Sequence, residues 1–161
     1  MVLSNDISVF LLIPAGIPTI ASFSFILSVF KSQSPSNLSR PMNILISNDD
    51  GWGSPGIRIL EKAAQRLGNV WVVAPATPMS GISHQMTFEM PMSLDECAPQ
   101  SFSLTGSPAD CTRVAMSQLD VEFDWVLSGV NQGANLGADM AVSGTVAAIR
   151  EAGYFGCRGI A

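Results

Sequence analysis

Two adjacent aspartates, Asp49 and Asp50, directly follow a short apolar run and are the most promising chemical groups in this chain of 161 residues. Two carboxylates about 4 Å apart repel each other by ~4 kcal/mol at an effective dielectric constant near 20. A divalent cation would offset this repulsion, and so would a proton on one of the two carboxyl groups. Because Asn-Asp-Asp-Gly is also good turn sequence, a solvated turn is an alternative interpretation of the same residues.

Two further loops contain neutral oxygen donors and glycines. Ser80 and Gly81 offer a hydroxyl and a backbone amide, although an ordinary Ser-Gly turn explains them equally well. Asn131 and Asn135 lie among glycines, which let backbone amides approach an anion closely, and their carbonyl oxygens suit a hard metal ion. Residues 143–145 (Ser-Gly-Thr) begin a predicted helix, whose free amides could bind phosphate besides being capped.

The composition excludes several other kinds of protein. With 47% apolar and 13% charged residues, the chain is too apolar for intrinsic disorder. A net charge of −5 offers no attraction for the phosphates of a nucleic-acid polymer. Three widely spaced cysteines exclude a disulfide scaffold and a zinc ribbon, and favour reduced thiols in the cytoplasm. The single histidine, His84, excludes a site with several histidine ligands; it could donate a proton or contact phosphate, but a packed or surface position is favoured.

Strands and helices alternate along the chain from residue 42 onward, and they must position these groups. The first strand, helix and second strand form a βαβ unit, which implies parallel pairing and a right-handed crossover. In parallel α/β sheets, ligands bind beyond the carboxyl ends of the strands, and the loops 48–54, 75–85 and 129–143 leave such ends. The apolar runs and helical spacings predict strands at 43–47, 70–74 and 124–128, short strands or a hairpin within 86–105, helices at 55–67, 108–119 and 143–153, and the start of a strand at 159–161.

Residues 51–56 also match the G-x-G-x-x-G fingerprint of dinucleotide-binding proteins, between a strand and a helix. The acidic residue that should hold a ribose hydroxyl is missing, because the second strand ends in Ala-Pro-Ala-Thr at 74–77. Two aspartates before the first glycine would also repel a pyrophosphate. Binding of a nucleotide cofactor is therefore a minor alternative.

Residues 1–41 differ in composition from the domain predicted at 42–161. No charged residue occurs from Ile7 to Phe30, a stretch long enough for a membrane span of ~20 residues. Two prolines interrupt it, and no Lys or Arg precedes it as a signal peptide would require. We expect a disordered or artefactual extension that ends in a flexible linker; a membrane or export segment and a segment packed on the domain are the alternatives.

Several blocks of the sequence resemble the SurE survival-protein nucleotidases, in the order and spacing of that family over 120 residues. The resemblance implies a Rossmann-like, three-layer αβα sandwich with a mostly parallel sheet. It also implies a metal-dependent phosphatase, a 5′-nucleotidase acting on nucleoside 5′- or 3′-monophosphates. The blocks are Met42–Gly51 with Pro55-Gly56, Val72–Pro75, Ser80–His84, Gly106–Cys111, Ser128–Gly137 and Ser143–Ala148.

By position, the resemblance assigns four metal ligands and five phosphate contacts. An all-oxygen ligand set favours Mg²⁺ or Mn²⁺ over zinc, and such an ion would polarise the phosphoryl oxygen and lower the pKa of a bound water. Within the catalytic pair Asp49 and Asp50, we expect Asp50 to orient that water. The implied ligands are Asp49, Asp50, Ser80 and Asn131, and the implied phosphate contacts are Gly81, Asn135, Ser143, Gly144 and Thr145.

The chain also departs from the family pattern. Residues 76–79 (Ala-Thr-Pro-Met) lack the charged Asp-x-x-x-Arg character often found there. Family members carry an additional C-terminal part, which is implied to build a homodimer or tetramer and to close the cleft. Residues 42–161 are therefore expected to be the N-terminal half of a truncated domain. A non-catalytic remnant that binds metal or nucleotide without turnover is the second hypothesis, and a membrane-tethered module carried by residues 7–30 is the third.

Overall fold

The computed structural model describes residues 40–133 and 135–161. The interpretations of the apolar segment 7–30 and of most of the linker therefore lie outside the described residues. Among the helices of the described part, none has both the length and the hydrophobicity that a membrane span requires.

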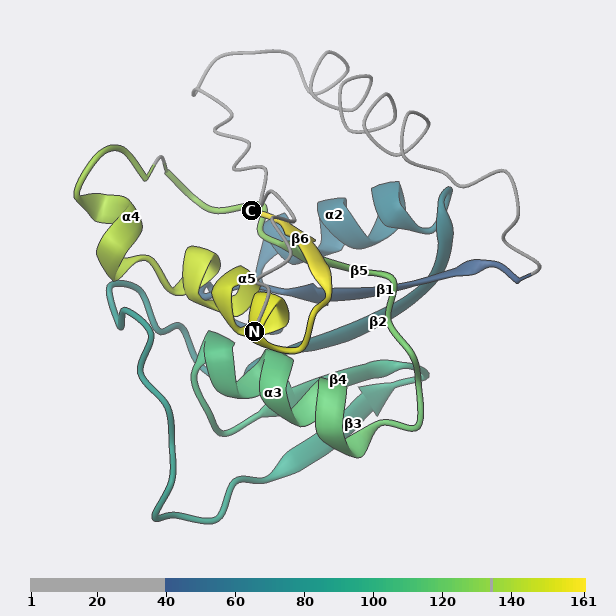
Figure 1. Cartoon of the computed structure of the whole chain (residues 1–161), viewed down its shortest axis with the longest axis horizontal. Helices are drawn as coiled ribbons and strands as arrows, with labels where there is room; N and C mark the ends of the chain where they lie inside the picture. The colour runs from purple at the N-terminus through teal and green to yellow at the C-terminus, as the bar shows by residue number, and fades with distance from the viewer. Residues whose placement is uncertain (1–39, 134) are drawn as a thin grey trace, which may run out of the picture.

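A six-stranded sheet with the order β3-β4-β2-β1-β5-β6 forms the centre of the described chain (Figure 1). Neighbouring strands are parallel except for the antiparallel hairpin of β3 and β4 at one edge. The predicted α/β class, the mostly parallel sheet and the hairpin within 86–105 are thus confirmed. The strands are β1 (Met42–Ser47), β2 (Gly68–Pro75), β3 (Leu94–Ala98), β4 (Ser101–Leu104), β5 (Trp125–Ser128) and β6 (Arg158–Ile160).

Helices cover both faces of the sheet and produce three layers (Figure 1). α2 (Pro55–Ala64) buries Ile57, Leu60 and Ala64 on one face. α3 (Pro108–Gln118) and α5 (Gly144–Tyr154) pack on the other face. Because both faces are covered, β1 is a continuous apolar run whose central Ile-Leu-Ile is fully buried.

Two details of the helices differ from the prediction. α2 ends at Ala64, not at residue 67, because the amides of Arg66 and Leu67 bond to carbonyls three residues back and tighten the chain into a turn. Gly68 then opens β2, where a Cβ would lie 2.1 Å from the Met42 carbonyl oxygen. A four-residue helix, α4 (Asp139–Val142), interrupts the predicted loop 129–143.

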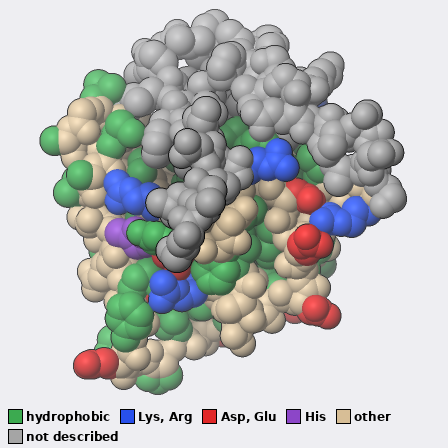
Figure 2. Space-filling view, viewed as in Figure 1, with side chains coloured by type: hydrophobic (Ala, Val, Ile, Leu, Met, Phe, Trp, Pro, Cys, Tyr) green, Lys and Arg blue, Asp and Glu red, His purple; other side chains and the backbone are tan. Residues whose placement is uncertain are grey.

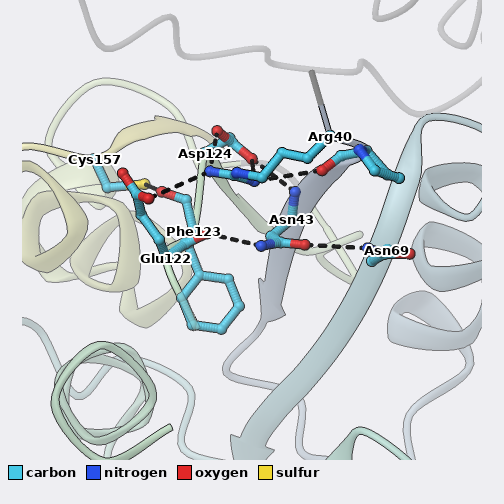
Figure 3. Close-up of polar contacts among 8 residues, drawn as sticks. Arg40, Asn43, Asn69, Glu122, Phe123, Asp124 and Cys157 are labelled. Carbon is cyan, nitrogen blue, oxygen red and sulfur yellow. Dashed lines mark hydrogen bonds and ion pairs between the residues drawn. The ribbon is translucent and has the colours of Figure 1, made fainter. Parts of the chain in front are cut away.

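A polar network closes the amino-terminal end of the central strands (Figure 3). Arg40 donates to both carboxylate oxygens of Asp124, at 2.8 and 3.2 Å. The backbone amide of Asn43 donates to the same carboxylate at 2.7 Å. The thiol of Cys157 lies nearby, where burial, followed by the charge of Asp124, raises its pKa to about 11. All three cysteines of the chain are free thiols, as the sequence predicted.

Candidate active site

A pocket of about 220 Å³ opens at the carboxyl ends of the central strands. β1 and β5 end side by side, with Ser47 paired to Ser128, so that the loops that follow them leave the sheet together. All of its described lining residues come from the loops 48–54, 75–85 and 129–143, which the sequence predicted to meet there. Six predicted site residues lie in its wall: Asp49, Ser80, Gly81, Asn131, Asn135 and Ser143.

Asp49 is the most buried acidic group of this wall, at 4% exposure. The hydroxyl of Thr145 donates to its Oδ1 at 2.6 Å, and its backbone carbonyl accepts the amide of Met79 at 2.7 Å. Burial raises the pKa of the Asp49 carboxyl, the hydrogen bond from Thr145 opposes this rise, and the charge of Asp50 adds to it. The ionised form is therefore disfavoured, as expected where a cation is to be bound.

Asp50 lies beside the pocket and is not part of its lining. Its Oδ2 accepts the backbone amide of Gln132 at 3.2 Å, which ties it to the loop at 129–137, called the Gly-rich loop below for its three glycines. The turn that carries both aspartates is built by Asn48, whose side chain is fully buried. Asn48 accepts the Gly51 amide at 3.1 Å and donates to the Ser54 hydroxyl at 2.7 Å. The turn alternative is thus realised, but Asn48 and Asp49 are buried in it and only Asp50 remains partly exposed among these three residues.

The Gly-rich loop brings Asn131 to the same place. Asn131 Oδ1 lies 3.5 Å from the Thr145 hydroxyl, so this hydroxyl stands between the Asp49 carboxylate and the Asn131 amide. The loop rests on the start of α2, where a Cβ on Gly56 would lie 2.0 Å from the Val130 carbonyl oxygen. Residues 51–56 contribute nothing to the pocket lining in the described chain. Of the three fingerprint glycines, Gly51 has a positive φ and Gly56 allows the close approach of Val130, whereas Gly53 has open space around it.

The first residues of α5 stand partly behind the pocket. Ser143 lines it and also caps the helix, since its hydroxyl accepts the Val146 amide at 3.2 Å. Gly144 and Thr145 do not line it: a Cβ on Gly144 would lie 2.8 Å from Cβ of Asp49, and Thr145 binds that carboxylate. Gly144 and Thr145, which were predicted to contact phosphate, therefore lie against Asp49 in the structure.

Sequence reasoning missed four residues of the lining: Gln132, Gly133, Asp139 and Val142. Asp139 is the most informative of them, because it adds a second carboxylate to the wall. Its position in the sequence, between the Gly-rich loop and residues 143–145, could have indicated that Asp139 lies at the site. His84, in contrast, is absent from the described lining; its Nε2 contacts Glu151, as the packed interpretation predicted.

The donor set fits a hard divalent cation. Within the described residues, no group of three or more His, Cys, Asp or Glu side chains could hold a metal ion, so an ion here would need neutral oxygens as well. Asn131 and Ser80 line the same pocket as Asp49 and supply such oxygens. The described lining includes two carboxylates but no Lys, Arg or His, so an anionic ligand would need a bound cation to balance its charge.

Comparison with known proteins gives consistent matches. The family model described as survival protein SurE matches residues 44–161. Proteins named 5′-nucleotidase SurE are 44% identical over 128 residues in Vibrio campbellii (78% of this chain, 50% of that protein) and 49% identical over 111 residues in Acinetobacter baumannii (68% and 44%). The crystal structure of the SurE protein from Aquifex aeolicus matches with a TM-score of 0.71 and 39% identity, covering 74% of this chain and 49% of that one. The chain thus spans about half the length of the relatives that it matches.

Proposed function

The chain belongs to the survival protein SurE family, and from this premise we propose that it is a metal-dependent phosphatase that hydrolyses nucleoside 5′- or 3′-monophosphates. The observation that carries the proposal is the environment of Asp49. This carboxylate is buried, its pKa is raised, and it faces a pocket whose other donors are neutral oxygens and one more carboxylate. Such a wall can bind a phosphate ester only together with a cation.

Asp49, Asp50, Ser80 and Asn131 would hold Mg²⁺ or Mn²⁺. When bound, the ion would polarise the phosphoryl group and lower the pKa of a water molecule. The hydrogen bond from Thr145 favours the ionised form of Asp49 against the effect of burial and orients its carboxylate. The Gln132 amide holds Asp50, which would orient the attacking water.

The phosphate itself would lie against the Gly-rich segments. Gly81, Asn135 and Ser143 line the pocket and offer an amide, a side-chain amide and a hydroxyl. The first amides of α5, at Gly144 and Thr145, add the positive end of the helix dipole. These donors would stabilise the negative charge that develops on the phosphoryl oxygens during the reaction.

Phosphate release tests the proposal directly. The purified chain is incubated with 5′-AMP, 5′-GMP or 3′-AMP, with and without Mn²⁺ or Mg²⁺, and inorganic phosphate is measured. We expect metal-dependent release that Asp49→Asn abolishes together with Mn²⁺ binding. Asp124→Asn, at the opposite end of the sheet, is the control and should retain both. Hydrolysis by Asp49→Asn at the parent rate would show that the metal assignment is wrong.

A second candidate function rests on the same donors in the pocket wall, which suffice to bind a cation and a phosphate group whether or not hydrolysis follows. In this case the chain would bind Mn²⁺ or a nucleotide without turnover. The same experiment separates the two, because calorimetric Mn²⁺ binding without phosphate release would support the binding protein.

The proposed partner is a small nucleoside monophosphate, and we propose a cytoplasmic homodimer or tetramer that does not bind a nucleic-acid polymer. On the described part of the face seen in Figure 2, Lys and Arg side chains lie among acidic and uncharged ones. Together with the net charge of −5, this distribution supports a small-molecule substrate, because polymer binding relies on a basic surface.

A further inference from the structure

His84 lies outside the pocket and is held against a buried carboxylate. Its Nε2 lies 2.9 Å from Oε2 of Glu151, whose side chain is 1% exposed. Arg113 Nε donates to the other oxygen, Oε1, at 2.7 Å. Because an ionised carboxylate can only accept hydrogen bonds, this contact requires a proton on Nε2 of His84. Glu151 therefore has a partner on each oxygen, as a buried charge must.

The segment 76–93, which includes His84, also carries Ser80 into the pocket. It has no regular secondary structure, and its position depends on contacts with the helices beneath it. The Ser83 amide donates to the last carbonyl of α4 at 2.8 Å. The amide and hydroxyl of Thr87 donate to the buried carboxylate of Asp110 on α3, at 3.0 and 2.8 Å. The contact of His84 reaches α5.

α5 thus contacts both sides of the pocket. Near its start, Thr145 binds the Asp49 carboxylate. Less than two turns further on, Glu151 holds His84. α5 therefore positions Asp49 directly through Thr145. It also contacts the segment 76–93, which contains Ser80, through His84.

We propose that His84 is a positioning residue: its hydrogen bond to Glu151 fixes the segment 76–93 so that Ser80 stays in the wall of the pocket that Asp49 also lines. The proposal depends on the proposed function only for the role of Ser80 as a metal ligand. The positioning itself is a property of the metal-free chain, and it can be measured there.

Amide hydrogen exchange of the metal-free chain tests the positioning. The Met79 amide is the reporter, since it bonds to the Asp49 carbonyl at 2.7 Å and exchanges when the segment lifts. His84→Leu removes the donor, and we expect Met79 to exchange about 10- to 100-fold faster, as for a lost hydrogen bond to a charged group. His84→Gln places an amide donor near the position of Nε2 and should restore the parent rate. If His84→Leu does not fold, His84→Asn, whose shorter side chain cannot reach Glu151, replaces it.

Two controls separate positioning from general stability. Amides of Ile44 to Ile46 in β1 should keep their rates in His84→Leu, because they report opening of the core. Asp124→Asn removes a charged contact at the other end of the sheet and should leave Met79 unchanged. An unchanged Met79 rate in His84→Leu overturns the proposal, and so does a rise that Met79 and the β1 amides share equally.

Calorimetric binding of Mn²⁺ then connects the positioning to the site. We expect about 10-fold weaker binding in His84→Leu and recovery in His84→Gln. If the parent binds Mn²⁺ and His84→Leu binds it equally well while Met79 exchanges faster, the proposed link to Ser80 is overturned. If the parent binds no Mn²⁺, the proposed metal site fails, and the exchange rates alone decide whether His84 positions the segment.

Discussion

Replacing Gly56 by alanine tests whether the Gly-rich loop must rest on α2 for Asn131 to serve the site. The new Cβ would lie 2.0 Å from the Val130 carbonyl oxygen and 3.1 Å from its carbonyl carbon, whereas ordinary contacts begin near 3.4 Å. The neighbouring atoms belong to the backbone and cannot rotate away, so loop and helix must separate by more than an ångström. Asn131 directly follows Val130, and metal–ligand distances tolerate deviations of only about 0.2 Å. We therefore expect Mn²⁺ to bind at least about 10-fold more weakly to Gly56→Ala.

The matched control is Gly53→Ala in the same turn, where an added Cβ would meet nothing within 4 Å. Both variants and the parent are titrated with Mn²⁺ by calorimetry and unfolded in urea. Gly56→Ala should lose about 1–3 kcal/mol of stability, the usual cost of overpacking, while Gly53→Ala should resemble the parent in both measurements. Parent-like Mn²⁺ binding by a folded Gly56→Ala would refute the reasoning, because the loop would then tolerate the displacement without consequence for the site.

Three further predictions concern the charge of the pocket. Thr145→Val removes the hydrogen-bond donor to Asp49, so the pKa of Asp49 should rise further. Mn²⁺ affinity, measured by calorimetry, should therefore fall about 10-fold or more, and the loss should be larger at pH 5 than at pH 8. Thr145→Ser keeps the hydroxyl and should bind Mn²⁺ like the parent. Asp49→Asn should raise the melting temperature of the metal-free chain at pH 7. A carboxyl whose pKa is raised in the fold opposes folding once it ionises, so the gain should disappear below its ordinary value of 3.8; a lower melting temperature at pH 7 would contradict this. Finally, Mn²⁺-dependent phosphate release should be faster from 5′-AMP than from tripolyphosphate, because the described lining has no basic side chain to balance extra charge; equal rates would contradict this selection.

Much of the fold could be predicted because the signals are local. The apolar run in β1 indicates burial on both faces, and the helical spacing of Ile57, Leu60 and Ala64 indicates the face that α2 presents to the sheet. The meeting of Asp49, Ser80 and Asn131 in one pocket follows from the rule that the carboxyl ends of parallel strands share one edge.

The remaining features depend on contacts between residues far apart in the sequence. His84 and Glu151 are separated by 67 positions, and nothing in either neighbourhood indicates the partner. The early end of α2 depends on how the chain turns into β2, which propensity does not specify. Thr145 was predicted to contact phosphate, but its hydrogen bond to Asp49 requires knowledge of how α5 lies on the end of β1.

The ion pair of Arg40 with Asp124 holds the first described residue beside the amino-terminal end of β1. β1 leads from this ion pair to Asp49 over six residues, a rise of about 20 Å. A fluorescent reporter joined directly before Arg40 would therefore be attached about 20 Å from the end of β1 that carries Asp49. A shortened version begun at Met42 would leave the Asp124 carboxylate without its guanidinium partner, so for biophysical work Arg40 is the better first residue to retain.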